Sequence, residues 1–200
     1  RRETKPLAVM VRDLDTGRPL FAASARELNE LASASRPIVL LRKGLAAPWM
    51  DIVAPGLDSV GVMLPYTGIH RVLFSSMRTD ALVMTSANPP GAPMHVENKE
   101  MFGLGADCYL LHNREIANRC DDSVVKLYGA NRFFVRRSRG YVPRSFPVKM
   151  DGSVLGVGPG ENVTACVAAQ RALTPSQYIG DTGDYDVGEY HRSAIDGQMR

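Results

Sequence analysis

The chain has 200 residues, of which 44% are hydrophobic, 22% charged and 7% aromatic, and its formal net charge is +3. This composition is typical of a soluble globular domain and excludes a disordered tail, a coiled coil and a collagen-like repeat. Its longest apolar runs are about four to five residues against the roughly 18–20 that a membrane-crossing helix needs, so we expect no membrane association.

Strands and helices alternate along the chain. Apolar runs predict strands, and apolar residues at helical spacing predict helices. The expected strands are 7–11, 38–41, a segment within 53–64, 81–84, 108–111, 124–128 and 133–135, and the expected helices are 24–34, 68–77 and 96–103. Residues 128–131 would join the last two strands as a hairpin. The pattern predicts an α/β (α+β) domain with a twisted mixed β-sheet and flanking helices.

The balance of charge changes near residue 150. Residues 1–150 hold 21 basic and 14 acidic side chains, a net charge of +7, whereas residues 151–200 hold three and seven, a net charge of −4. Prolines interrupt regular structure at the same place. We therefore predict a domain over 1–145, a linker over 146–152, and the opening strands of a second domain over 153–200. The basic part favours an anionic partner, either a nucleotide phosphate or a nucleic acid.

Three cysteines suggest a reducing compartment. Cys108, Cys120 and Cys166 are an odd number at wide spacings, without a Cys-x-x-Cys pair. Such a set favours neither a disulfide framework nor a zinc site. We expect a cytoplasmic protein with no metal site in this chain. Because the chain opens with Arg1 rather than Met, we interpret it as a fragment.

Polar side chains follow two of the predicted strands. Ser86 and Asn88 come directly after the strand at 81–84, where their short donors could reach phosphate oxygens. The alternative for this segment is a plain turn after an edge strand. Arg137, Ser138 and Arg139 follow the strand at 133–135, and guanidinium groups bind phosphates in a bidentate manner. The alternative there is a basic linker or a surface that touches RNA.

Two further segments could contribute to a site. Asp121 and Asp122 could hold a magnesium ion or fix nearby arginines, and Ser123 would stand at the start of the next strand. His70 falls in the first turn of a predicted helix whose N-cap is Thr67, where an imidazole could either pack or contact a ligand. Common glycine-rich phosphate loops are absent from the sequence, so a bound nucleotide would be held by Ser, Asn and Arg at strand ends.

Six segments together resemble a known family. They are KPLAVMVRDL, RPIVLLRK, APGLDSVGVMLPYTGIH, LVMTSANPPGAP, LHNREIANRCDDSVVK and RRSRGYVP. In this order they are similar to the YrdC-like domain of HypF carbamoyltransferases, which mature [NiFe] hydrogenases. The tail from Val154 resembles the start of the TsaD-like domain, of the actin-like ATPase type, that follows in HypF.

The resemblance implies an activity and its reactants. The YrdC-like domain would form carbamoyl-adenylate from carbamoyl phosphate and ATP with Mg²⁺, and the carbamoyl group would pass to the C-terminal cysteine of a HypE-type acceptor protein. It would become the cyanide ligand of the hydrogenase iron. Zinc would belong only to parts of the family outside this chain. No general base is implied, because the protein would act by positioning and by neutralising charge.

The resemblance also implies site residues. The expected nucleotide-binding residues are Arg2, Lys5, Ser86, Asn88, Ser123, Arg137, Ser138 and Arg139. Expected members of the substrate pocket are His70, Asn113 and Arg119.

The sequence departs from the family at two places and leaves two other functions open. Pro90 stands where a serine is usual, and Arg71 where a second histidine is frequent. One alternative is a threonylcarbamoyl-adenylate synthase of tRNA modification, which would share the Ser-x-Asn motif. The other is a non-catalytic YrdC-like module that binds double-stranded RNA, for which affinity would fall steeply with salt.

Overall fold

A computed structural model describes residues 6–44 and 47–199, so Arg2 and Lys5 lie outside the described residues. The chain divides into two compact units. The first unit contains Arg1–Thr85 and Asp122–Gly140, and the second contains Ser86–Asp121 and Tyr141–Arg200. Within the described ranges, no helix is long and apolar enough to cross a membrane.

A mixed seven-stranded sheet forms the centre of the first unit. Its strand order is β5-β1-β4-β3-β6-β7, with β2 paired to β3. Strand β1 runs parallel to β4, and β3 runs parallel to β6, whereas the other pairs are antiparallel. The strands are β1 (Ala8–Val11), β2 (Phe21–Ala22), β3 (Ile38–Lys43), β4 (Ser59–Met63), β5 (Ala81–Met84), β6 (Val124–Tyr128) and β7 (Asn131–Arg136).

Both faces of this sheet are covered at its centre. Successive side chains of a strand point to opposite faces, so a strand with apolar residues at every position has two faces to bury. Val9 and Val11 of β1 join one core cluster, together with Leu31 and Met50 from the helices. Met10, between them, joins a second cluster with Phe74.

Short helices provide that cover. They are α1 (Leu14–Gly17), the 3-10 turn η1 (Arg18–Leu20), α2 (Ala25–Ala32), α3 (Met50–Val53) and α4 (Gly68–Ser76). Helix α2 begins with a capping box, in which Ser24 and Glu27 each accept from the other's backbone N–H. Its Leu31 lies in the first core cluster, and Phe74 brings α4 into the second.

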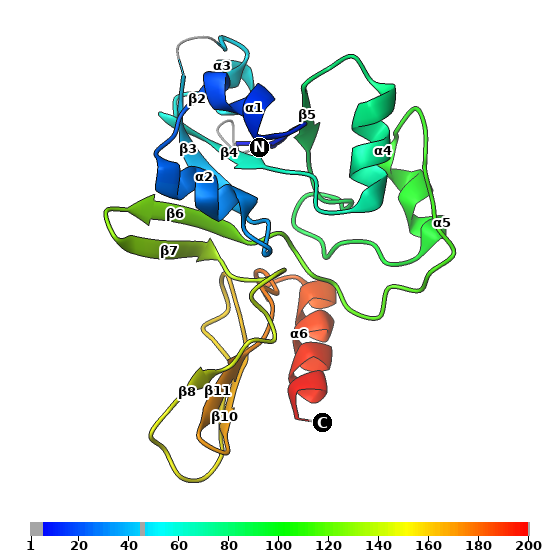
Figure 1. The fold of residues 1–200 in the computed structure, drawn as a ribbon. Coiled ribbons are helices and arrows are strands. Elements are labelled where there is room, and N and C mark those ends of the chain that lie inside the picture. Colours follow the sequence, from blue (N-terminus) through cyan, green and yellow to red (C-terminus); the bar gives the residue numbers. More distant parts are fainter. Residues whose placement is uncertain (1–5, 45–46, 200) are drawn as a thin grey trace. The chain divides into compact units, whose positions relative to one another are not determined.

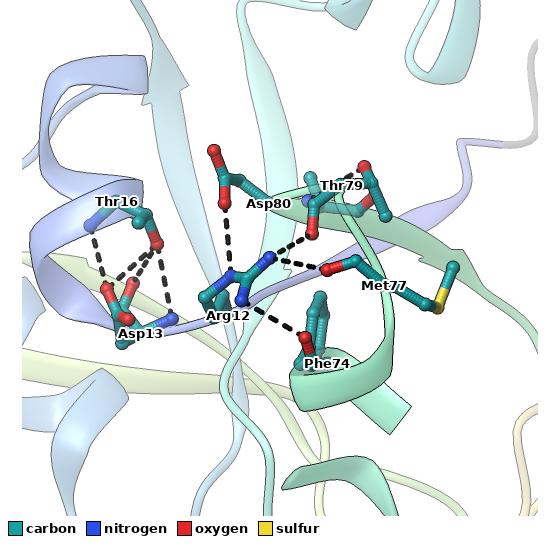
Figure 2. A network of polar contacts seen from close by, with 8 residues as sticks. Arg12, Asp13, Thr16, Phe74, Met77, Thr79 and Asp80 are labelled. Atoms are coloured by element: carbon teal, nitrogen blue, oxygen red, sulfur yellow. Dashed lines mark hydrogen bonds and ion pairs between the residues drawn. The ribbon is translucent and has the colours of Figure 1, made fainter. Parts of the chain in front are cut away.

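Arg12 ties the end of α4 to β1 (Figure 2). Its Nη1 donates to Phe74 O at 3.0 Å, and its Nη2 donates to Met77 O at 3.0 Å and Thr79 O at 2.9 Å. Its Nε donates to Asp80 Oδ1 at 3.1 Å. The last carbonyls of a helix lack partners within the helix, and here the Arg12 guanidinium donates hydrogen bonds at the end of α4.

The second unit has a sheet of its own with strand order β8-β11-β10-β9. Its elements are α5 (Asn98–Met101), the 3-10 turn η2 (Phe102–Leu104), β8 (Phe146–Pro147), β9 (Val154–Gly156), β10 (Cys166–Ala169), β11 (Ala172–Pro175) and α6 (Tyr185–Gln198). Helix α6 stands beside β10 and β11 (Figure 1). Val187 and Tyr190 of that helix pack on Val163 and Ile179.

Most of the predicted elements are confirmed, and one is wrong. The mixed sheet, its flanking helices and the β6–β7 hairpin lie where the sequence predicts them. Residues 108–111, predicted as a strand, have no regular structure, because no neighbouring strand pairs with them. Helix α6 was not predicted from the sequence, and β8 lies inside the segment predicted as a linker. The predicted domain boundaries and the actin-like character of the tail stay predictions.

Candidate functional site

Arg139 is the centre of a polar cluster in the first unit. Its Nε donates to Asp122 Oδ1 at 2.7 Å, its Nη1 to Ser35 O at 3.1 Å, and its Nη2 to Arg36 O at 2.7 Å. The guanidinium carbon lies 3.6 Å from the centroid of the Tyr66 ring, a cation–π contact. Each guanidinium nitrogen therefore has an acceptor in the protein itself. Asp122 fixes an arginine, one of the two roles that the sequence left open for it.

Tyr66 and His70 complete this cluster. Their rings meet edge to face, with centroids 4.7 Å apart. Burial, followed by the charge of Asp122, raises the pKa of Tyr66 above its usual value of 10.0. Burial is also the main reason why the pKa of His70 falls below 6.5, while the charge of Asp122 partly offsets it. At neutral pH the site thus presents a phenol and a neutral imidazole.

His70 has a free hydrogen-bonding atom. Its Nδ1 is buried and, within the described residues, has no hydrogen-bond partner. A buried polar atom without a partner is costly, so such atoms in native proteins call for an explanation. The position was predicted as a substrate-pocket residue, and an unpartnered imidazole nitrogen is consistent with that role. Tyr66 was not predicted, because one tyrosine after a strand carries no signal in the sequence.

Ser123 and Ser138 are fully buried beside Arg139. The hydroxyl of Ser123 donates to Arg139 O at 2.9 Å and accepts from Ser138 N at 2.7 Å. The sequence predicted both serines, with Arg139, around one nucleotide. The structure does bring the three together, and it shows them holding the chain itself. Their contact with a nucleotide stays a prediction.

Gly140 allows the segment around Ser35 to approach. Its φ is +84°, and a Cβ at this position would stand 2.6 Å from Ser35 O. Ser35 Oγ donates to Gly140 O at 3.0 Å. With the two carbonyl contacts from Arg139, these interactions fix the backbone of Ser35 and Arg36. Only a glycine permits this conformation at so short a distance.

Ser86 and Asn88 belong to the second unit. Ser86 is exposed, whereas the Asn88 amide donates to Pro89 O at 3.0 Å and to Ala92 O at 2.8 Å. These bonds shape the loop after β5 and leave the Asn88 carbonyl oxygen as a potential acceptor. Because His70, Ser123, Ser138 and Arg139 lie in the first unit, a pocket shared by both sets stays a prediction.

The other predicted residues have varied surroundings. Asn113 is exposed. Arg119 donates from Nε to Met94 O at 2.6 Å, and its guanidinium carbon lies 5.1 Å from the centroid of the Tyr190 ring. Tyr190 in turn donates from its hydroxyl to Arg119 O at 3.0 Å. Arg137 is half-buried, with interactions in the structure. No group of three or more His, Cys, Asp or Glu side chains with metal-site geometry occurs among residues 6–44 and 47–199.

Comparison with known proteins gives two kinds of match. The family model Sua5_yciO_yrdC, described as Telomere recombination, matches residues 1–138. Carbamoyltransferase HypF2 of Cupriavidus necator is 41% identical and covers 92% of this chain, which in turn covers 25% of that protein. The chain thus spans about a quarter of the length of the relatives it matches.

Solved structures agree with this result. The crystal structure of HypF from T. kodakarensis is 43% identical with a TM-score of 0.93, covering 98% of this chain and 26% of its own. A full-length HypF in the phosphate- and nucleotide-bound form is 35% identical with a TM-score of 0.88, covering 98% of this chain and 31% of its own. Sua5 of P. abyssi, complexed with L-threonine, is 20% identical with a TM-score of 0.53 and covers 67% of this chain and 40% of its own, a likeness of fold alone.

Proposed function

Since the chain belongs to the Sua5/YciO/YrdC family and is similar to HypF over almost its whole length, we propose that it is part of a HypF-type carbamoyltransferase. Its proposed task is to form carbamoyl-adenylate from carbamoyl phosphate and ATP. A HypE-type protein would accept the carbamoyl group, and the product would be the cyanide ligand of a [NiFe] hydrogenase. The proposed location is the cytoplasm.

One observation carries this proposal. The similarity to HypF covers 98% of the chain and therefore includes nearly all of the 62 residues that follow the family match at 1–138. The similarity to Sua5 covers only 67% of the chain, at 20% identity. A threonylcarbamoyl-adenylate synthase would not require the additional C-terminal part. This difference favours the carbamoyltransferase over the first alternative.

The proposed reaction needs positioned charges rather than a nucleophilic side chain. Water would hydrolyse carbamoyl phosphate to carbamate and inorganic phosphate. A carbamate oxygen would then attack the α-phosphorus of ATP, which forms carbamoyl-adenylate and releases pyrophosphate. Mg²⁺ would arrive with ATP and neutralise charge on its phosphates. The protein then has to hold two anions in line and exclude water.

Residues of this chain suit that task in different ways. The exposed hydroxyl of Ser86 and the Asn88 carbonyl oxygen are open to a ligand, as a Ser-x-Asn nucleotide motif requires. The neutral His70 could accept a hydrogen bond at Nδ1 or donate one there without adding charge. Arg139 would act as a positioning residue, because its nitrogens already bind Asp122 and two backbone carbonyls.

Exchange of labelled pyrophosphate into ATP tests the proposal. The purified protein is incubated with ATP, Mg²⁺ and labelled pyrophosphate, with carbamoyl phosphate in one sample and with threonine plus bicarbonate in another. Exchange that depends on carbamoyl phosphate supports the proposal, and Ser86→Ala should reduce it. Exchange that depends on threonine would favour the synthase. No exchange, combined with salt-sensitive binding of double-stranded RNA, would favour the RNA-binding module.

A further inference from the structure

A cavity of about 360 Å³ in the first unit is lined by residues that the proposed reaction does not use. It lies between the start of α1, the end of α2 with the residues that follow it, the end of β4, and α4. Leu14, Ala32, Leu64 and Pro65 give it an apolar wall, and Arg36 and Arg71 stand at its polar side. None of these residues was singled out as a nucleotide contact. The cavity is larger than a bare phosphate ion requires.

Arg36 and Arg71 differ from the third arginine that lines the cavity. Arg12 is saturated by the end of α4 and by Asp80 (Figure 2). Among the described residues, the guanidinium groups of Arg36 and Arg71 find no hydrogen-bond or ion-pair partner. Two guanidinium groups from separate elements, at one cavity and without partners, favour an anionic ligand.

The backbone of Arg36 is held in one conformation by its neighbours. Its φ is +45°, a left-handed conformation that a non-glycine residue rarely adopts. The carbonyl of Arg36 accepts from Arg139 at 2.7 Å, and the preceding residue packs on Gly140. Such conformations persist where the surroundings enforce them, and they cluster at ligand-binding sites. The Arg139 cluster therefore gives Arg36 a defined position at the cavity.

Acidic residues limit the charge that the cavity can accept. Asp13 and Asp15 also line it. Asp13 Oδ1 accepts from the backbone N–H and the hydroxyl of Thr16, both at 2.8 Å, and these bonds lower the pKa of Asp13. Asp13 hence stays ionised at neutral pH. The repulsion from these two carboxylates grows with the charge of the ligand, so the two guanidinium groups suit a single phosphoryl group better than a triphosphate.

We propose that this cavity binds a small ligand carrying a single phosphoryl group, held between Arg36 and Arg71. The phosphoryl group could belong to a mononucleotide, whose remaining atoms would rest on the apolar wall, or to free inorganic phosphate. None of the residues that line the cavity is among those assigned to carbamoyl-adenylate formation. It is tested by binding alone, whether or not the protein transfers a carbamoyl group.

Calorimetric titration of the whole chain with AMP and with inorganic phosphate, at fixed ionic strength, tests this site. Arg36→Gln and Arg71→Gln should each weaken binding of both probes by about 10-fold or more, since each removes charge-assisted hydrogen bonds. Arg71→Lys should recover only part of the loss. The matched control is Arg42→Gln, which removes one exposed positive charge from β3 of the same unit. It should change neither affinity by more than about twofold.

The outcomes separate the ligand sources and the two proposals. Tighter binding of AMP than of phosphate identifies a mononucleotide, and equal affinities identify phosphate alone. Unchanged affinities in Arg36→Gln and Arg71→Gln, with thermal unfolding like that of the parent, would overturn the site. A loss as large in Arg42→Gln would do so too, because it would reflect general charge. Pyrophosphate exchange that survives Arg71→Gln would show that the two sites are independent.

Discussion

Replacing Arg139 with alanine should destabilise the first unit, although the sequence predicts a phosphate-binding role for this arginine. The substitution removes the donors to Asp122, Ser35 and Arg36, together with the cation–π contact on Tyr66. It leaves the Asp122 carboxylate without its closest positive charge. The two backbone carbonyls, which are partly buried, also lose their donors.

The size of the effect follows from the exposure of the pair. Removing one partner of a buried ion pair costs about 3–5 kcal/mol. The side chains of Arg139 and Asp122 each keep 23% of their surface exposed, so partial screening reduces the expected loss to about 2–4 kcal/mol. For a chain of this size each kcal/mol lowers the unfolding midpoint by about 2–4 °C, so we expect a fall of about 5–15 °C.

Fluorescence of the single tryptophan reports this change. Trp49 is the only tryptophan of the chain and lies in the first unit, where it packs against the main core. Its emission is followed during heating of the parent, Arg139→Ala and Arg139→Lys. Lysine should recover part of the midpoint by keeping the ion pair without the fork. The exposed Arg42→Ala is the control and should stay within about 2 °C of the parent.

A contrary result is easily recognised. If Arg139→Ala unfolds at the parent's midpoint but binds ATP about 10-fold more weakly, the guanidinium contacts phosphate and the structural role argued above is wrong. A fall in both quantities would be resolved by Arg139→Lys, because a positioning role predicts that stability and ATP affinity recover together.

Three further predictions concern the same unit. Gly140→Ala should lower the free energy of unfolding, followed by Trp49 fluorescence, by more than about 1 kcal/mol, because it adds a Cβ 2.6 Å from Ser35 O at φ +84°. The control is Gly129→Ala, at φ +55° with no atom within 4 Å of the added Cβ. It should be destabilised less, because it adds backbone strain without a steric clash. His70 has a lowered pKa, so its protonation favours the unfolded chain, and stability should fall as the pH drops through about 6.5. In His70→Gln the unfolding midpoint should change less between pH 7.5 and 5.5 than it does in the parent. An unchanged pH dependence would contradict the burial of this imidazole. Arg12→Ala should speed amide hydrogen exchange in the last turn of α4, whereas protection equal to that of the parent would mean that the four contacts in Figure 2 contribute nothing.

Local interactions made much of the fold predictable. The apolar runs at 7–11 and 38–41 form strands, because each is buried on both faces and contains no residue that opposes pairing. Ser24 and Glu27 start α2 through bonds within four residues. Elements that depend on distant partners were less predictable. Residues 108–111 have a strand-like composition but no strand beside them, and the glycines at 188 and 197 weaken the helical signal of α6.

For the site, the sequence alone determined which residue types are present and which strand ends they follow. It placed Ser123, Ser138 and Arg139 together, and the structure agrees. It could not determine that Arg139 donates to Asp122 and to two backbone carbonyls, because those carbonyls belong to residues 104 and 103 positions earlier in the chain. Nor could it show that the guanidinium of Arg36 has no partner among the described residues. A guanidinium binds whatever acceptor the fold brings within reach, so its role is decided only when the chain has folded.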